Sequence, residues 1–143
     1  QYIRGCMDSL LRQEGMDFDI LVVDNASGDG SREVLMQEYP KVQLICLEEN
    51  TGFCHAVNVG IQHSKTPFVI LLNNDTVVKQ GFVQGLVEAI EEQDTIFSVS
   101  SMMLSMQDES VIDDAGDGYC ILGWAYARGK GKPAKNNLDE KEV

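Results

Sequence analysis

Basic residues are scarce in this sequence. In 143 residues, 11 Lys and Arg stand against 23 Asp and Glu, so the formal net charge is −12. A protein that binds nucleic acid through its phosphates needs clustered Lys and Arg, and we therefore expect no nucleic-acid partner. No apolar run approaches the roughly 20 residues of a membrane-spanning helix. No basic segment followed by an apolar one opens the sequence, so a secretion signal is not expected either.

Several ligand-binding motifs are also absent. The cysteines form no CxxC pair and have no metal-site spacing to His55 or His63, so a zinc site is not expected. Neither GxGxxG nor GxxxxGK[ST] occurs, which argues against a dinucleotide fold and a P-loop. The scattered cysteines suggest small buried thiols in a reduced, cytoplasmic protein, with the cytoplasmic face of a membrane as an alternative location. They are Cys6, Cys46, Cys54 and Cys120.

What the sequence does contain is a repeated alternation of apolar strands and amphipathic helices. The expected helices are 1–13, 31–39 with Ser31 as the cap, 53–63 and 81–92, and the expected strands are 19–24, 42–47, 68–72 and 97–102. This order with short connections predicts an α/β sandwich with a mainly parallel sheet and helices on both faces. The polar last stretch and the uncapped first helix suggest a fragment of a longer protein.

Polar side chains follow two of the expected strands. The first strand ends at Asp24, and the third ends in Asn73, Asn74 and Asp75. In open α/β sheets, ligands bind outside the carboxyl ends of the strands. Mg²⁺ is often held by one or two carboxylates together with substrate phosphates, so an acidic chain can bind a small polyanion through a metal. The alternative is that these residues only form turns or helix caps.

A third polar motif opens the helix expected at 53–63. Gly52 would let a ligand approach the backbone, and the free N–H groups of the helix start favour an anion. Asn58 is an unfavourable residue in the middle of a helix unless its amide is used. An ordinary cap at Asn50 or Thr51 is the competing interpretation.

These motifs carry a resemblance. The segments LVVDNASGDGS, NTGFCHAVNVGI and VILLNNDT, in this order and spacing, resemble a family 2 glycosyltransferase of the GT-A fold, most closely its rhamnosyltransferase-like members. The resemblance covers residues 1–128. It implies a three-layer, Rossmann-like GT-A sandwich, incomplete at both ends, whose residues 1–128 bind a nucleotide sugar. Residues 129–143 would be a polar loop or tail leading to the acceptor-binding part.

The resemblance also implies roles for the residues of the donor site. Asp24 matches the acid that recognises the base or ribose of the nucleotide-sugar donor, and Asn25 lies beside it. Asn50 and Gly52 match the loop near the donor. Asn58 matches the asparagine that the family carries on the following helix.

The DxD motif of the family is matched by Asn73, Asn74 and Asp75. Asp75 would bind Mg²⁺ or Mn²⁺ bridging the diphosphate, and the metal would stabilise charge on the departing nucleotide. Asn73 replaces the first Asp of the motif and would contact the sugar or ribose instead. Asn74 belongs to the same donor site.

The implied reaction is an inverting, metal-assisted transfer from a UDP- or dTDP-sugar to a glycan or lipid-linked acceptor. It needs a base that deprotonates the acceptor hydroxyl, and no residue of this sequence is assigned to that role. The family's base is expected after the chain end, so the fragment alone should be inactive. Asp113, Asp114 and Asp117 are interpreted as an acceptor-side or loop cluster, and a solvated turn is the favoured interpretation.

Two other functions remain alternatives. A phospho-receiver domain also carries acids at strand ends, but it needs a lysine after a later strand, and residues 104–108 contain none. A nucleotidyltransferase would use a basic, Gly-rich loop near its start. For Trp124 and Tyr126, packing in the protein is favoured over stacking on a sugar, and both histidines are expected to be structural.

Overall fold

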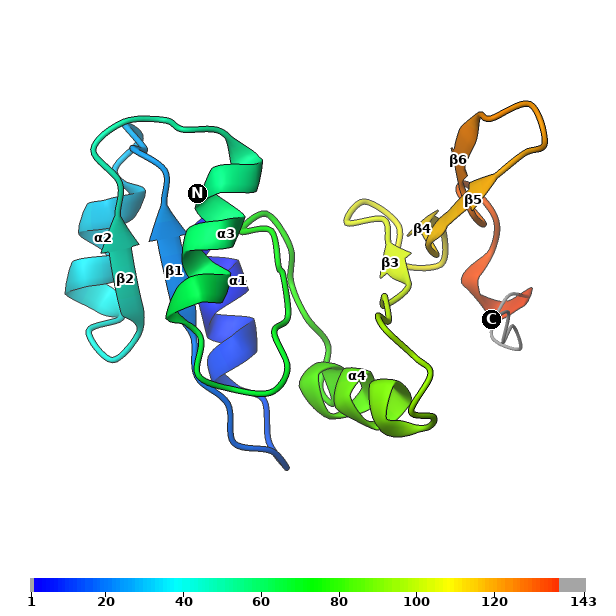
Figure 1. Ribbon diagram of the computed structural model, residues 1–143, viewed down its shortest axis with the longest axis horizontal. Helices are drawn as coiled ribbons and strands as arrows, with labels where there is room; N and C mark the ends of the chain where they lie inside the picture. The colour runs from blue at the N-terminus through cyan, green and yellow to red at the C-terminus, as the bar shows by residue number, and fades with distance from the viewer. Residues whose placement is uncertain (1, 137–143) are drawn as a thin grey trace. The chain divides into compact units, whose positions relative to one another are not determined.

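The computed structural model describes residues 2–136, and the chain forms two compact units, Gln1–Gly85 and Leu86–Val143. The first unit contains α1 (Tyr2–Leu11), β1 (Leu21–Asp24), α2 (Ser31–Glu38), β2 (Gln43–Cys46) and α3 (Phe53–His63) (Figure 1). Helix α4 (Phe82–Glu91) begins in the first unit and ends in the second.

Strands β1 and β2 are parallel neighbours, paired from Leu21 with Gln43 to Asp24 with Cys46. Val22 packs against the cluster around α1, whereas Val23 lies close to Gly60 of α3. Because neighbouring side chains of a strand point to opposite faces, α1 and α3 cover opposite faces of this sheet. The first unit is therefore a small three-layer α/β structure with a parallel pair, as the sequence predicted in its coarse form.

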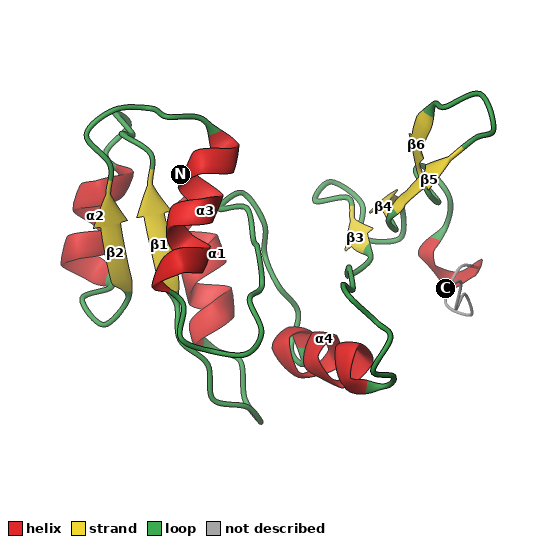
Figure 2. Cartoon of the chain, in the orientation of Figure 1, coloured by secondary structure: helices red, strands yellow, loops and turns green. Residues whose placement is uncertain are grey.

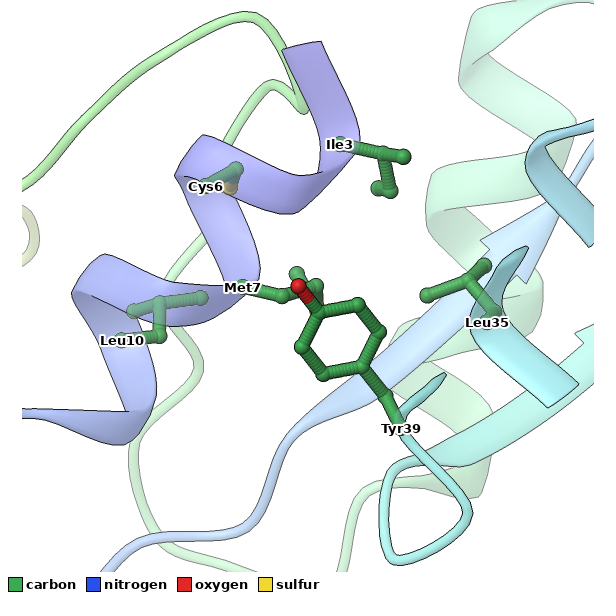
Figure 3. Packing of buried hydrophobic residues seen from close by; sticks show 6 residues of the cluster. All are labelled: Ile3, Cys6, Met7, Leu10, Leu35 and Tyr39. Atoms are coloured by element: carbon green, nitrogen blue, oxygen red, sulfur yellow. The ribbon is translucent and has the colours of Figure 1, made fainter. Parts of the chain in front are cut away.

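The core of the first unit lies between α1 and α2, on one face of the sheet (Figure 3). Its buried members are Ile3, Cys6, Met7, Leu10, Leu35 and Tyr39. The four α1 residues recur at helical spacing and so form one apolar stripe. Tyr39 follows α2, and its hydroxyl donates a 2.8 Å hydrogen bond to Asp8, so its polar end is satisfied at the edge of the core.

Two predicted strands are wrong. Residues 68–72 are extended but pair with no other strand among the described residues, and most of their side chains are exposed (Figure 2). Residues 97–102 also form no strand, and the short β3 (Met103–Leu104) follows them. Both segments are apolar enough for a buried strand, but a strand needs a hydrogen-bonded neighbour, which the sequence pattern alone does not supply.

Helix α3 has the predicted bounds, and β1, β2, α1, α2 and α4 are each slightly shorter than predicted. Ser31 does not cap α2: Gly30, with φ of 84°, occupies the cap position, and Ser31 is the first helical residue. The expected buried thiols are also wrong for three of the four cysteines, since only Cys6 is buried. No disulfide joins them.

The second unit contains short antiparallel pairs. β3 pairs with β4 (Ile112–Asp114), and β5 (Asp117–Tyr119) pairs with β6 (Ala125–Ala127). The loop predicted at 113–118 is thus mostly strand, with a turn in which Asp114 accepts a 2.8 Å hydrogen bond from Gly116 N–H. A short 3-10 turn, η1 (Ala134–Asn136), follows, and the rest of the predicted tail lies outside the described residues. No helix among residues 2–136 is long and apolar enough to cross a membrane.

Candidate functional site

Asp24 ends β1 and is only 5% exposed, and both oxygens of its carboxylate accept hydrogen bonds from the chain itself. Its Oδ1 accepts a 3.2 Å hydrogen bond from the Ser27 N–H. Its Oδ2 accepts two from Arg32 of α2, at 3.1 Å from Nε and 2.6 Å from Nη2. Arg32 Nη2 also donates to the Leu47 carbonyl after β2 at 3.4 Å. Arg32 therefore links the carboxyl ends of both strands.

The charge state of Asp24 follows from these contacts. Burial opposes ionisation, but the hydrogen bonds from Ser27 and Arg32 and the charge of Arg32 outweigh it, so the pKa of Asp24 is lowered. The same contact raises the pKa of Arg32. The end of β1 is thus held as an ionised, oriented carboxylate.

Asn25, Asn50, Thr51 and Gly52 form a hydrogen-bonded group that we call the asparagine staple. Asn25 Oδ1 accepts from the backbone N–H of Thr51 at 3.0 Å and from its hydroxyl at 3.2 Å. Asn25 Nδ2 donates to Asn50 Oδ1, and Gly52 N–H donates to the same oxygen, both at 3.0 Å. The staple joins the turn after β1 to the loop before α3, although 25 residues separate the two asparagines.

Helix α3 begins directly after this staple. Its cap position is Gly52, with φ of 84° and no side-chain cap bond, so neither Asn50 nor Thr51 caps the helix. A Cβ at Gly52 would meet nothing within 4 Å, which leaves the backbone open to close approach. Asn58 lies in the middle of α3 with its side chain exposed. The first turn of α3 thus starts at Gly52, which has open space beside its backbone and is held in place by Asn25 and Asn50.

The side chains of Asn73, Asn74 and Asp75 are all exposed, on a turn that follows the extended segment 68–72. The Thr76 hydroxyl donates to the Asn73 carbonyl at 2.7 Å, and the Cys6 thiol of α1 contacts the same carbonyl at 3.8 Å. Burial raises the pKa of Cys6, so the thiol stays protonated and able to donate. The turn is anchored to α1 through its backbone.

Within residues 2–136 no hydrogen bond joins this turn to Asp24 or to the asparagine staple. The structure therefore brings together Asp24, Asn25, Asn50 and Gly52, but it does not connect them to Asn58 or to Asn73–Asp75. Leu72, just before the turn, and Val22 of β1 pack against the same cluster of α1. A hollow of about 560 Å³ in the first unit is lined by Ser9, Leu11, Arg12, Gln13, Glu14, Val78 and Gln80, none of which is a predicted site residue.

The turn at Asn73–Asp75 carries oxygen atoms of the kind that bind a hard cation. Asp75 offers one exposed carboxylate, and the two neighbouring asparagines offer amide oxygens. No group of three or more His, Cys, Asp or Glu side chains that could hold a metal occurs in the described part of the chain. These residues fit an ion that is held by one carboxylate and completed by substrate phosphates, as Mg²⁺ often is.

Arg32 is the main residue that the sequence analysis missed. It is the second residue of α2, where a long side chain leans toward the helix start and therefore toward the end of β1. A signal for this role was available in the sequence. Arg32 follows the buried Asp24 by eight residues, in a chain poor in Lys and Arg. No sequence signal pointed to Ser27, whose backbone N–H donates a hydrogen bond to Asp24.

The comparison with family models decides the family. The model "Glycosyl transferase family 2" matches residues 1–131, which is most of the chain. This chain belongs to glycosyl transferase family 2. Members of the family typically use a divalent metal ion, and the family implies the GT-A fold, of which the described residues show a partial sheet.

The relatives of this chain are bacterial proteins, and several of them are named as glycosyltransferases. The chain is 29% identical over 116 residues to the putative teichuronic acid biosynthesis glycosyltransferase TuaG of Bacillus subtilis, covering 78% of this chain and 46% of the relative. It is 27% identical over 97 residues to glycosyltransferase GlyG of Streptococcus pneumoniae, covering 66% and 32%. It is 33% identical over 79 residues to the teichoic acid poly(glycerol phosphate) polymerase of Staphylococcus epidermidis, covering 52% and 11%.

The chain therefore spans less than half the length of each of these relatives. No solved structure matches it. The relatives' names refer to teichoic and teichuronic acids and to glycosyltransferases in general. The comparisons therefore establish the family, but they do not establish the rhamnosyltransferase-like subgroup that the sequence suggested.

Proposed function

We propose that the intact protein transfers a sugar from a nucleotide-diphosphate sugar to a hydroxyl acceptor, with inversion at the anomeric carbon. The observation that carries this proposal is the joint position of Asp24 and the asparagine staple at the carboxyl ends of β1 and β2, in a chain of glycosyl transferase family 2. This is the edge where open α/β sheets bind ligands. Family membership favours this function over a phospho-receiver domain or a nucleotidyltransferase.

In this proposal Asp24 and Asn25 recognise the base or ribose, and Asn50, Gly52 and Asn58 line the donor. Asp24 is held ionised by Arg32, which suits an acceptor for the N–H of a uracil or thymine ring. Gly52 leaves room beside the backbone at the start of α3. A UDP- or dTDP-sugar is therefore the donor class that we propose.

Asp75 would hold Mg²⁺ or Mn²⁺ at the diphosphate, with Asn73 contacting the sugar or ribose and Asn74 in the same donor site. The ion would supply positive charge for the departing nucleotide. Asn73 in place of an acid is the basis for the rhamnosyltransferase-like subgroup. No residue of this chain is proposed as the general base.

The acceptor is proposed as a glycan or a lipid-linked glycan of the bacterial surface, at the cytoplasmic face of the membrane. The names of the relatives support a cell-surface polymer, since they refer to teichoic and teichuronic acid. The sugar and the linkage stay open in this proposal.

Calorimetric titration of UDP and dTDP into the intact protein, with and without Mg²⁺, tests the donor site. We expect metal-dependent binding that Asp75→Ala weakens at least about tenfold, because the diphosphate loses the ion that bridges it. Asp94→Ala removes another exposed acid from a different loop and should leave affinity unchanged. Absence of nucleotide binding with metal present would falsify the donor-site proposal, and equal affinity in Asp75→Ala would remove Asp75 from it.

A further inference from the structure

Arg32 of α2 has hydrogen-bond donors that its own chain does not use. A guanidinium carries five N–H groups, one on Nε and two on each of the terminal nitrogens. Nε and Nη2 donate to Asp24 Oδ2 at 3.1 Å and 2.6 Å, and Nη2 also donates to the Leu47 carbonyl at 3.4 Å. Nη1 has no hydrogen-bond partner among residues 2–136. Its N–H groups can therefore serve a ligand.

The free end of Arg32 lies at the edge of the sheet where the other candidate donor residues meet. Its two partners, Asp24 and Leu47, stand at the carboxyl ends of β1 and β2. Asn25 of the asparagine staple directly follows Asp24, and Asn50 lies in the loop that follows Leu47. The Arg32 side chain is 34% exposed and that of Asp24 only 3%, so most of the surface that this ion pair offers to a ligand belongs to Arg32.

The charges of the pair favour a neutral polar group over a phosphate at this position. The charge of Arg32 is offset by the ionised Asp24, whose Oδ2 lies 2.6 Å from Nη2. A phosphate bound at Nη1 would be close enough to Asp24 to be repelled by it. A carbonyl oxygen accepts the same N–H groups without this repulsion. The free end of Arg32 therefore suits a carbonyl oxygen of a nucleobase better than the diphosphate.

We propose that Arg32 is a specificity-determining residue of the donor site, and that its Nη1 donates to a base carbonyl oxygen next to the ring N–H that Asp24 accepts. This inference rests on the proposed function, which assigns base recognition to Asp24. Uracil and thymine carry a carbonyl oxygen beside a ring N–H, which matches a donor beside an acceptor. Cytosine carries an amino group beside an acceptor nitrogen, so both contacts would be mismatched. Arg32 and Asp24 together would thus select UDP over CDP.

Calorimetric titration of UDP and of CDP into the intact protein with Mg²⁺ tests this role, because the two ligands differ only in the base. We expect the wild type to bind UDP at least about tenfold more tightly than CDP, since mismatched hydrogen bonds to charged groups cost at least that factor. Arg32→Met should weaken UDP binding about tenfold and should not weaken CDP binding. The retained CDP binding would show that the variant is folded.

Arg4→Met is the matched control. Arg4 also binds a carboxylate of α2 through Nε and Nη2, but its partner is Glu38, at the opposite end of the helix from Arg32. This change should leave both affinities unchanged.

Arg32→Lys separates the charge of Arg32 from the shape of its guanidinium. The ammonium still compensates Asp24, so the stability in urea should stay closer to that of the wild type than in Arg32→Met. It lacks the planar fork that serves Asp24 and a ligand at once, so the ratio of UDP to CDP affinity should stay at least about threefold below the wild-type ratio.

The possible failures can be told apart. Metal-dependent binding of UDP and CDP with equal affinity by the wild type would overturn base selection by Arg32 and leave the donor-site proposal intact. An affinity ratio that Arg32→Met leaves unchanged would also overturn it, including the case in which both nucleotides are weakened equally, because Arg32 would then act only on the structure. Binding of neither nucleotide by the wild type would contradict the proposed function and this inference with it.

Discussion

At the scale of single residues, the pair of Asp24 and Arg32 governs the end of β1. A buried carboxylate is stable only when its charge is compensated, and Arg32 supplies two of its hydrogen bonds. The Asp24 side chain is 3% exposed, whereas the Arg32 side chain is 34% exposed, so solvent screens part of the attraction. The pair therefore orients Asp24 more than it stabilises the whole fold.

Arg32→Met should lower the free energy of unfolding at pH 7, because Asp24 stays buried with fewer partners. The folded-state pKa of Asp24 is lowered, so its contribution is fully present above the unfolded value of about 3.9 and is lost as pH falls through the lower folded value. The difference between wild type and variant should therefore shrink below about pH 4. Urea unfolding across this range measures it, with the exposed Arg12→Met as control. A difference that persists undiminished in acid would contradict this account.

At the scale of elements, the asparagine staple fixes the loop before α3 to the turn after β1. Its hydrogen bonds join segments that the sheet does not otherwise connect, since α3 meets β1 through Gly60 and Val23 near the other end of the helix. The staple thus decides where the first turn of α3 lies relative to Asp24. In the proposed function this placement orients the donor-binding loop.

A double-mutant cycle on Asn25→Ala and Asn50→Ala tests this coupling. We expect the two changes to be non-additive, with an interaction of about 0.5–1.5 kcal/mol in unfolding free energy, because each removes the same amide contact. Nucleotide affinity should show the same non-additivity. Asn58→Ala, on the exposed surface of α3, combined with Asn25→Ala provides an additive control for stability. Additive effects of Asn25 and Asn50 would show that the staple carries no coupling.

At the scale of the whole molecule, the parallel sheet has fewer strands than the number of strand-like apolar segments in the sequence. β1 has one strand neighbour, and the apolar residues 68–72 have none among the described residues. Backbone groups of an apolar segment are costly when they lack partners. We propose that residues 68–72, which form no strand in this chain, gain a hydrogen-bonded strand neighbour in the intact protein.

Amide hydrogen exchange tests this arrangement. The amides of residues 68–72 should be protected in the intact protein and should exchange rapidly in the chain of 143 residues alone. Val59 in α3 serves as an internal reference, because its N–H lies within a helix in both. The chain alone should also lack transferase activity. Rapid exchange of residues 68–72 in the intact protein, or full activity of the chain alone, would refute the proposal.

The local elements of the first unit were predictable from the sequence, because their signals are local. The periodicity of Ile3, Met7 and Leu10 marks α1, and the motif around Gly52 marks the start of α3. The candidate donor residues were likewise named from strand ends and resemblance. The strands at 68–72 and 97–102 were predicted wrongly, because strand formation depends on a neighbour that an apolar run does not specify.

By itself the sequence determined the family, the parallel pair that ends in Asp24 and the positions of the polar motifs, since these depend on residue type and spacing. Only the tertiary structure decided which groups meet. It paired Arg32 with Asp24, joined Asn25 to Asn50, and left Trp124, which was expected to pack inside the protein, exposed in the loop between β5 and β6. The physical reason is that hydrogen bonds and burial depend on distances between segments far apart in the chain, which local patterns leave open.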